Sequence, residues 1–272
     1  MATIIQNPPE TNPNPEPEEE HSDGKQMSFF EHLEELRQRL IRAILSLFVA
    51  FGICFYFSDH IYGFLAKPLT DTLHSLHLPE KLVYTNPIDP FNLYIKLSFV
   101  AGLFLASPFI LYQLWLFISP GLYRHEKRYV WPFVTLTSGL FITGGLFAHQ
   151  LALPPALRFL VEFGGQFTPF ITIDQYWKLV MTIVIGVGLV FELPVIILVL
   201  SIFGIVTPKF LIKNVRYAVL LTAILAAAIA PTPDLATVFI LWIPMVGLYV
   251  ISIGLSWLVY LKKKRARKHE QA

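Results

Sequence analysis

The sequence has few charged residues and only one cysteine, and both shortages narrow what the chain can be. Of its 272 residues only 15% are charged, 54% are hydrophobic, and the mean hydropathy is +0.57. Soluble domains carry about 25% charged residues, so this composition indicates an integral membrane protein. Cys54 lies in an apolar run, which excludes an intrachain disulfide and a cysteine-based metal site.

The motifs of common enzyme classes are missing as well. The chain contains no Walker-type phosphate loop, no HExxH zinc motif and no GxSxG nucleophile elbow. We therefore expect no enzyme, no catalytic residue, no metal or other cofactor, and no nucleic-acid partner. An ATP-driven pump is disfavoured for the same reason.

The ends of the chain differ in composition from its centre. Residues 1–27 are rich in proline and glutamate, with little to bury, and predict a disordered acidic tail. They lack the basic start and apolar core of a secretory signal, so we expect this tail to stay on the side where it is made. Residues 28–261 form the expected membrane domain, and residues 262–272 a basic cytoplasmic tail.

Six apolar runs are candidates to cross the membrane, since a hydrocarbon core of about 30 Å needs about 20 apolar residues of helix. None shows the alternation of a barrel strand, so we expect an all-α polytopic protein. The runs cover residues 40–57, 91–118, 129–153, 176–203, 217–230 and 235–261.

The basic residues predict the orientation. Sixteen of the 21 lysines and arginines lie at one set of span ends. Five lie at the opposite ends, namely Lys67, Lys81, Lys96, Arg158 and Lys178. The positive-inside rule then places both termini in the cytoplasm, as expected for a protein of the inner cell membrane.

Prolines and one short run predict the shape. Pro108, Pro132, Pro194 and Pro244 lie inside or near the starts of four runs, where proline bends a helix. Residues 217–230 would span only about 21 Å, so local thinning of the bilayer is expected. We predict a cupped, concave bundle.

Two acidic residues stand out at the cytoplasmic side. Glu35 lies in an amphipathic stretch that leads into the first span and is spaced i,i+4 from Arg39, which on its own predicts an exposed ion pair. Glu126 is the only acid in a basic turn after the second span, and a solvated loop residue is its simplest interpretation.

Four segments carry a family resemblance. They are "HLEELRQRL" before the first span, "SPFILYQLWLFISPGLYRHEKR" at the second turn, "FELPV" in the fourth span and "PTPD" before the last. Together, and in this order, they resemble the signature segments of TatC, the largest subunit of the twin-arginine protein translocase. The likeness covers residues 28–261.

The resemblance implies a receptor for signal peptides with consecutive arginines on folded cargo. It assigns twin-arginine recognition to Glu35 and Glu126, with Leu36, Arg37, Phe117 and Tyr123 as the supporting face. One carboxylate can meet a planar guanidinium bidentately, whereas lysine lacks that fork. It also implies TatA and TatB single-span partners, homo-oligomers within a TatB–TatC complex, and transport driven by the membrane potential and proton gradient.

Four further positions follow from the same motifs. Glu192 lies near mid-depth in the fourth span, where it must face protein or water or carry a proton. The family associates it with recruiting partner helices, and a purely stabilising hydrogen bond is the alternative. Pro68, Pro194 and Asp234 are expected to be structural, with Asp234 capping the last helix. Family members often have glutamine where this chain has Val238, so a polar contact there is in doubt.

Two other functions remain open from the residues alone. A secondary transporter could use Glu192 as a proton or ion relay, although such folds usually show inverted repeats, and none is evident here. A non-transporting scaffold is the other alternative. The receptor is the best supported of the three.

Overall fold

A computed structural model describes residues 29–79, 81–118, 130–167 and 169–270 of the chain. The acidic tail predicted for residues 1–27 lies outside this part. Within it, helices alternate with short connections and no strand occurs. The elements are α1 (Phe29–Tyr56), α2 (Ser58–Ser75), α3 (Asp89–Ile118), α4 (Val130–Phe147), the π-helix η3 (Ala148–Ala152), α5 (Leu153–Phe163), α6 (Ile173–Val190), α7 (Leu193–Ile202), α8 (Pro208–Lys213), α9 (Val215–Ile229) and α10 (Leu235–Glu270).

Five stretches of this part are long and apolar enough to cross a membrane. They are Phe30–Tyr56, Asp89–Phe117, Trp131–Phe163, Ile173–Ile202 and Leu235–Leu261. Helix α9, with 15 residues, is the predicted short run and is about 22 Å long at 1.5 Å per residue. The all-α polytopic fold is therefore confirmed, while the count of six crossings and the cytoplasmic termini stay predictions.

One boundary differs from the sequence prediction. The third apolar run was expected to end at residue 153, but the helix continues through η3 and α5 to Phe163. Pro154 and Pro155 fall in the first turn of α5, directly after the π-helix η3. Helix α10 runs on to Glu270, and the boundary at residue 262 between the membrane domain and the basic tail stays a prediction.

The fourth apolar run is broken near its middle. Helix α6 ends at Val190 and α7 begins at Leu193, with Pro194 in its first turn. Pro108 and Pro244 lie inside continuous helices, α3 and α10. The break therefore occurs at only one of these three prolines. The cupped shape of the bundle stays a prediction.

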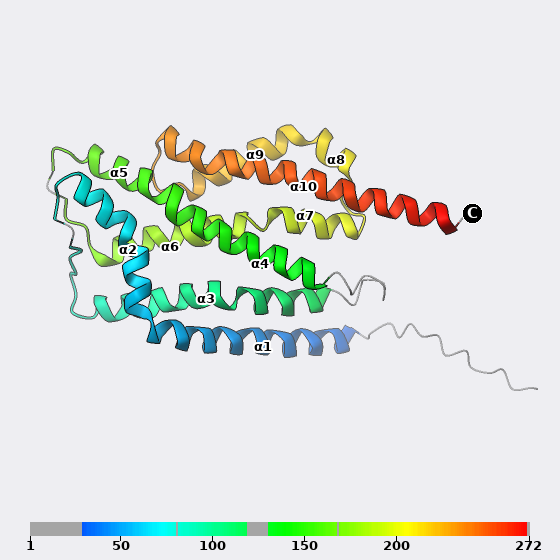
Figure 1. The fold of residues 1–272 in the computed structure, drawn as a ribbon, viewed down its shortest axis with the longest axis horizontal. Helices are drawn as coiled ribbons and strands as arrows, with labels where there is room; N and C mark the ends of the chain where they lie inside the picture. The colour runs from blue at the N-terminus through cyan, green and yellow to red at the C-terminus, as the bar shows by residue number, and fades with distance from the viewer. Residues whose placement is uncertain (1–28, 80, 119–129, 168, 271–272) are drawn as a thin grey trace, which may run out of the picture.

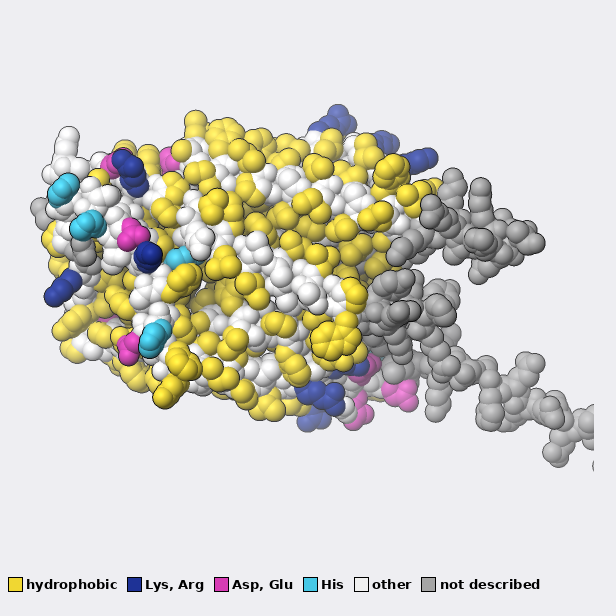
Figure 2. Space-filling view, in the orientation of Figure 1, with side chains coloured by type: hydrophobic (Ala, Val, Ile, Leu, Met, Phe, Trp, Pro, Cys, Tyr) yellow, Lys and Arg dark blue, Asp and Glu magenta, His cyan; other side chains and the backbone are white. Residues whose placement is uncertain are grey.

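The long helices run roughly parallel along the molecule, as Figure 1 shows. Helices α1 and α3 lie side by side at one flank, α9 and α10 form the other, and α4, α6 and α7 lie between them. Helix α2 first crosses this bundle and then turns toward the end of the bundle that lies away from the C-terminus. Figure 2 shows hydrophobic side chains covering the surface along the helices, as a lipid-facing protein requires.

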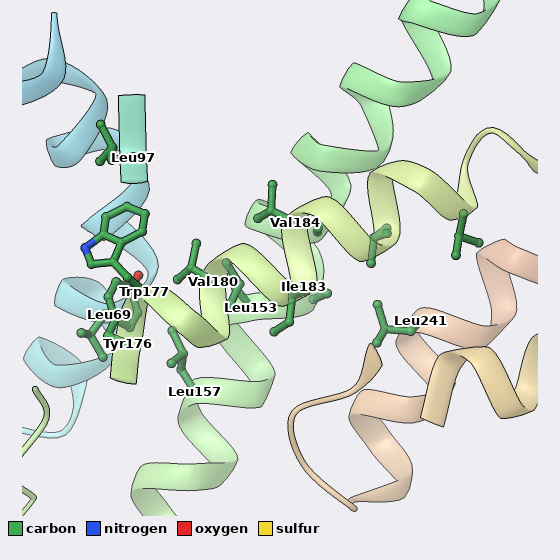
Figure 3. Packing of buried hydrophobic residues seen from close by; sticks show 14 of the residues in the cluster. Leu69, Leu97, Leu153, Leu157, Tyr176, Trp177, Val180, Ile183, Val184 and Leu241 are labelled. Carbon is green, nitrogen blue, oxygen red and sulfur yellow. The ribbon is translucent and has the colours of Figure 1, made fainter. Parts of the chain in front are cut away.

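The largest buried cluster surrounds α6, and Figure 3 shows part of it. Trp177, Val180 and Ile183 of α6 are at most 2% exposed. They pack among side chains of α2, α3, α5 and α10, including Leu69, Leu97, Leu153, Leu157 and Leu241. This core fixes the position of α6 along the bundle, and with it the position of the break at residues 191–192.

Candidate functional site

Glu35 forms an ion pair within α1, near the N-terminal end of this helix. Arg39, one turn further on, donates from Nε to Glu35 Oε1 at 2.9 Å and also donates from Nη2 to the same oxygen. Each side chain is only 18% exposed. The predicted pair exists, but the prediction that it is exposed is wrong, since both side chains are largely covered.

The second oxygen of Glu35 has a different environment. Oε2 is buried and accepts no hydrogen bond from the described residues. His32 Nδ1 lies 3.9 Å from this oxygen, beyond hydrogen-bond distance. Because Arg39 occupies one oxygen, this carboxylate can still accept a hydrogen bond from an incoming donor at the other.

The same histidine joins α1 to the end of α3. The ring of His32 stacks on Phe117 with centroids 4.5 Å apart and planes 16° from parallel. Glu35 and Phe117, which the sequence groups on one recognition face, therefore lie at the same end of neighbouring helices. Leu36 and Arg37 are exposed beside them. Glu126 and Tyr123 lie outside the described residues, so their place relative to Glu35 stays a prediction.

Glu192 lies in the two-residue break between α6 and α7. Its backbone N–H donates to Leu189 O at 3.1 Å, while its own carbonyl accepts from Val195 and Ile196 at 3.0 Å. The side chain is half-buried, and its Oε1 is buried without a hydrogen-bond partner in the described chain. A polar group of this kind in an apolar region is costly unless something else binds it.

Small residues bring α4 and α6 close together next to this break. A Cβ added at Gly144 would lie 2.8 Å from the Phe191 ring and 3.1 Å from Gly188 Cα. Larger side chains would push the helices apart. The position of Phe191, and so of Glu192, depends on this contact.

Asp234 caps the start of α10. Its Oδ2 accepts from the backbone N–H of Thr237 at 2.7 Å, and its Oδ1 accepts from the hydroxyl of Thr232. Burial alone raises the pKa of Asp234, but these hydrogen bonds outweigh it and hold the pKa below its ordinary value. Val238, one turn later, packs against the core cluster as an apolar residue.

Pro68 lies inside α2, and its surroundings include two residues that the sequence analysis missed. Proline leaves the carbonyl four residues earlier without its helical donor, and here that is Phe64 O. His149 Nε2 lies 3.1 Å from this oxygen, and Tyr176 donates its hydroxyl to the neighbouring Leu65 O at 3.0 Å. The only sequence signal was that a mid-helix proline needs such a donor.

Comparisons with known proteins identify the family. The family model described as Sec-independent protein translocase protein (TatC) matches residues 31–244. A TatC of Koribacter versatilis is 46% identical over 247 residues, covering 91% of each chain. A TatC of Aquifex aeolicus is 38% identical over 246 residues, covering 89% of this chain and 100% of the relative.

Solved structures agree with the sequence relatives. A crystal structure described as the twin-arginine translocase receptor TatC matches with a TM-score of 0.70 and 37% identity, covering 85% of this chain and 100% of that one. A second crystal structure of that receptor, in the detergent DDM, matches with a TM-score of 0.71 and 39% identity, covering 83% and 99%. The chain described here belongs to the TatC family of Sec-independent protein translocase proteins.

Proposed function

We propose that this chain is the receptor subunit of a twin-arginine protein translocase in the inner cell membrane. It binds signal peptides with consecutive arginines on folded proteins, and Glu35, Glu126 and their neighbours form the recognition face. It recruits single-span partners of the TatA and TatB families, in complexes with several copies of this chain, for export driven by the proton gradient.

The free oxygen of Glu35 carries the proposal. It is a buried acceptor at the end of α1, next to Phe117, in a chain whose solved relatives are described as twin-arginine receptors. A hydrogen bond to a charged group contributes about 1.5–3 kcal/mol. An arginine of the peptide can bind Oε2 directly, or displace Arg39 and bind both oxygens with its planar fork.

Glu192 supports the recruitment of partner helices. Its unpartnered oxygen lies at a helix break within the membrane span Ile173–Ile202. A polar side chain of a single-span helix would satisfy it, since polar side chains hydrogen-bond across helices in membranes.

A peptide-binding measurement tests the recognition face. The purified chain in nanodiscs is titrated with a fluorescent signal peptide carrying two arginines, or two lysines at the same positions. We expect Glu35→Gln to weaken binding of the arginine peptide about tenfold, since one charged acceptor is lost. Glu34→Gln makes the same charge change at an exposed neighbour and should leave affinity within about twofold. Equal affinities of the two variants would contradict the assignment of Glu35.

Removing Arg39 tests the competition for Glu35. Arg39→Gln frees Oε1 and should tighten binding of the arginine peptide. Arg42→Gln removes the same charge from an exposed position of α1 and corrects for the general loss of repulsion. If both variants gain affinity equally, Arg39 does not compete with the peptide for this carboxylate.

A further inference from the structure

An apolar pocket that the proposed function does not use opens on the side of the bundle. Its volume is about 210 Å³, and its walls come from α2, α3, α4, η3 and α6. They include Phe64, Ala101, Phe104, Gly145, Leu146 and His149. Figure 2 shows a hollow at this place, between the positions that α2, α3 and α4 have in Figure 1, with hydrophobic side chains around it.

Two local contacts shape this pocket: Gly145 lies against Phe104, and His149 holds Phe64. A Cβ at Gly145 would lie 2.4 Å from the Phe104 ring, so only glycine lets this ring lie against α4. The His149 ring stacks on Phe64 at 4.4 Å between centroids, and its Nε2 lies 3.1 Å from Phe64 O. Because a carbonyl oxygen only accepts, Nε2 carries the proton of this hydrogen bond. The contact holds α2 over the pocket.

We propose that this pocket binds one hydrocarbon chain of a membrane phospholipid, whose phosphate lies at Lys67. The pocket opens among side chains of membrane-length helices, where lipid is the surrounding solvent. The pocket is small, at about 210 Å³, and an α-helix with its side chains is about 10 Å wide. A single acyl chain therefore suits it better than a whole transmembrane helix.

Lys67 supplies the charge that selects a phospholipid. It lies three residues after Phe64 on α2, and positions three apart share a face of a helix. The residue is exposed, and in the described part of the chain its ammonium makes no ion pair. Pro68 follows directly, at the bend that takes α2 toward the end of the bundle that lies away from the C-terminus.

Two other ionisable groups of α2 lie beside the pocket at the start of the helix, since Asp59 and His60 directly precede Ile61, which also lines it. Asp71 lies a full turn beyond Lys67. Lys67 is the basic group nearest to Phe64 along α2. A phosphate at Lys67 leaves its chain within reach of the pocket under Phe64.

Photolabelling tests this site on the full chain. The protein is reconstituted in vesicles of phosphatidylethanolamine and phosphatidylglycerol with a trace of phosphatidylglycerol that carries a diazirine in one acyl chain. After irradiation, the labelled residues are mapped by mass spectrometry. We expect labels to concentrate on the pocket segments of α2, α3 and α4.

Two pairs of variants separate a specific site from bulk lipid. Ala101→Phe fills the pocket and should lower its labelling about fivefold, because a ring and a chain cannot share a close-packed space. Leu105→Phe, at an exposed position one turn further along α3, should leave labelling unchanged. Lys67→Gln should lower labelling by the phospholipid but not by a diazirine diacylglycerol, which has no phosphate. Lys178→Gln, at an exposed position of α6, is its control.

Three results would overturn the proposal. They are equal pocket labelling in Ala101→Phe and the original chain, labels spread evenly over the lipid-facing helices, and a pocket labelled by a photoreactive side chain of a single-span partner but not by lipid. Ala101→Leu is a smaller filling variant should the phenylalanine prevent folding. Since labelling needs no signal peptide, Glu35→Gln should keep it, and the two proposals can fail separately.

Discussion

Pro68 and Pro194 both interrupt helical hydrogen bonding, and the surroundings of the two prolines differ. At Pro68, the carbonyls of Phe64 and Leu65 receive hydrogen bonds from His149 and Tyr176, which belong to other helices. Next to Pro194, the break instead exposes the side chain of Glu192, whose Oε1 has no partner in the described chain.

The contrast separates backbone carbonyls whose hydrogen bonds are made inside the protein from a carboxylate that can accept one from another molecule. A polar group with all its hydrogen bonds made inside the protein contributes to stability. A buried polar group without one is a cost that binding can remove. We therefore expect substitutions around Pro68 to change stability, and those at Glu192 to change association.

The largest effect is expected at His149. His149→Leu puts an apolar side chain of similar size in place of the imidazole and leaves Phe64 O without a donor. This should lower the free energy of unfolding by about 2 kcal/mol. Tyr176→Phe removes only the hydroxyl bonded to Leu65 O and should cost about 1 kcal/mol. Both are measured by denaturant titration in detergent micelles. If neither variant is destabilised, the carbonyls near Pro68 are not held as described.

A smaller effect is expected at Asp234, an acid whose oxygens both have donors. Asp234→Ala should cost about 1 kcal/mol at neutral pH, the usual value of a helix cap. The pKa of Asp234 is lower in the folded state than its ordinary value. Its contribution is therefore present above the unfolded-state pKa and is lost as the pH falls through the folded-state pKa.

Unfolding measured across the acidic range checks the sign of this effect. The difference between the original chain and Asp234→Ala should shrink toward low pH. Asp234→Asn keeps a capping acceptor without a titrating group, so the contribution of its cap should not change with pH. A deficit of Asp234→Ala that stays constant with pH would argue against capping by the ionised carboxylate.

The smallest effect on stability is expected at Glu192. Glu192→Gln should change the free energy of unfolding by less than about 0.5 kcal/mol, because no partner is lost. Crosslinking to a single-span partner helix should nevertheless fall. Glu162→Gln, which makes the same charge change in the last turn of α5, should leave crosslinking intact. Lower stability with unchanged crosslinking would mean that Glu192 serves the fold alone.

Much of the fold could be predicted from local patterns in the sequence. Hydropathy located five membrane-length stretches and the short α9. Pro194 predicted a bend in the fourth stretch, where the structure shows a break. The π-helix η3 had no such signal, since it depends on how α4 packs. The donors near Pro68 had no local signal either, because His149 and Tyr176 are 85 and 111 residues away from the carbonyls that they contact.

The candidate site was predicted to a similar extent. The spacing of Glu35 and Arg39 predicted their ion pair, because residues four apart meet on a helix. Its burial could not be foreseen, since it depends on α1 lying against α3 and on His32 reaching Phe117. Motif resemblance selected Glu35, and the structure added the unequal environments of its two oxygens.

The pairing of α1 with α3 also bears on how the chain is made. Among the described helices, α1 packs almost entirely against α3, and a Cβ at Gly102 would lie 3.0 Å from the backbone nitrogen of Phe51. All residues of this contact have left the ribosome once α3 has emerged from it. The two helices can therefore associate during synthesis and give the later ones a surface on which to assemble.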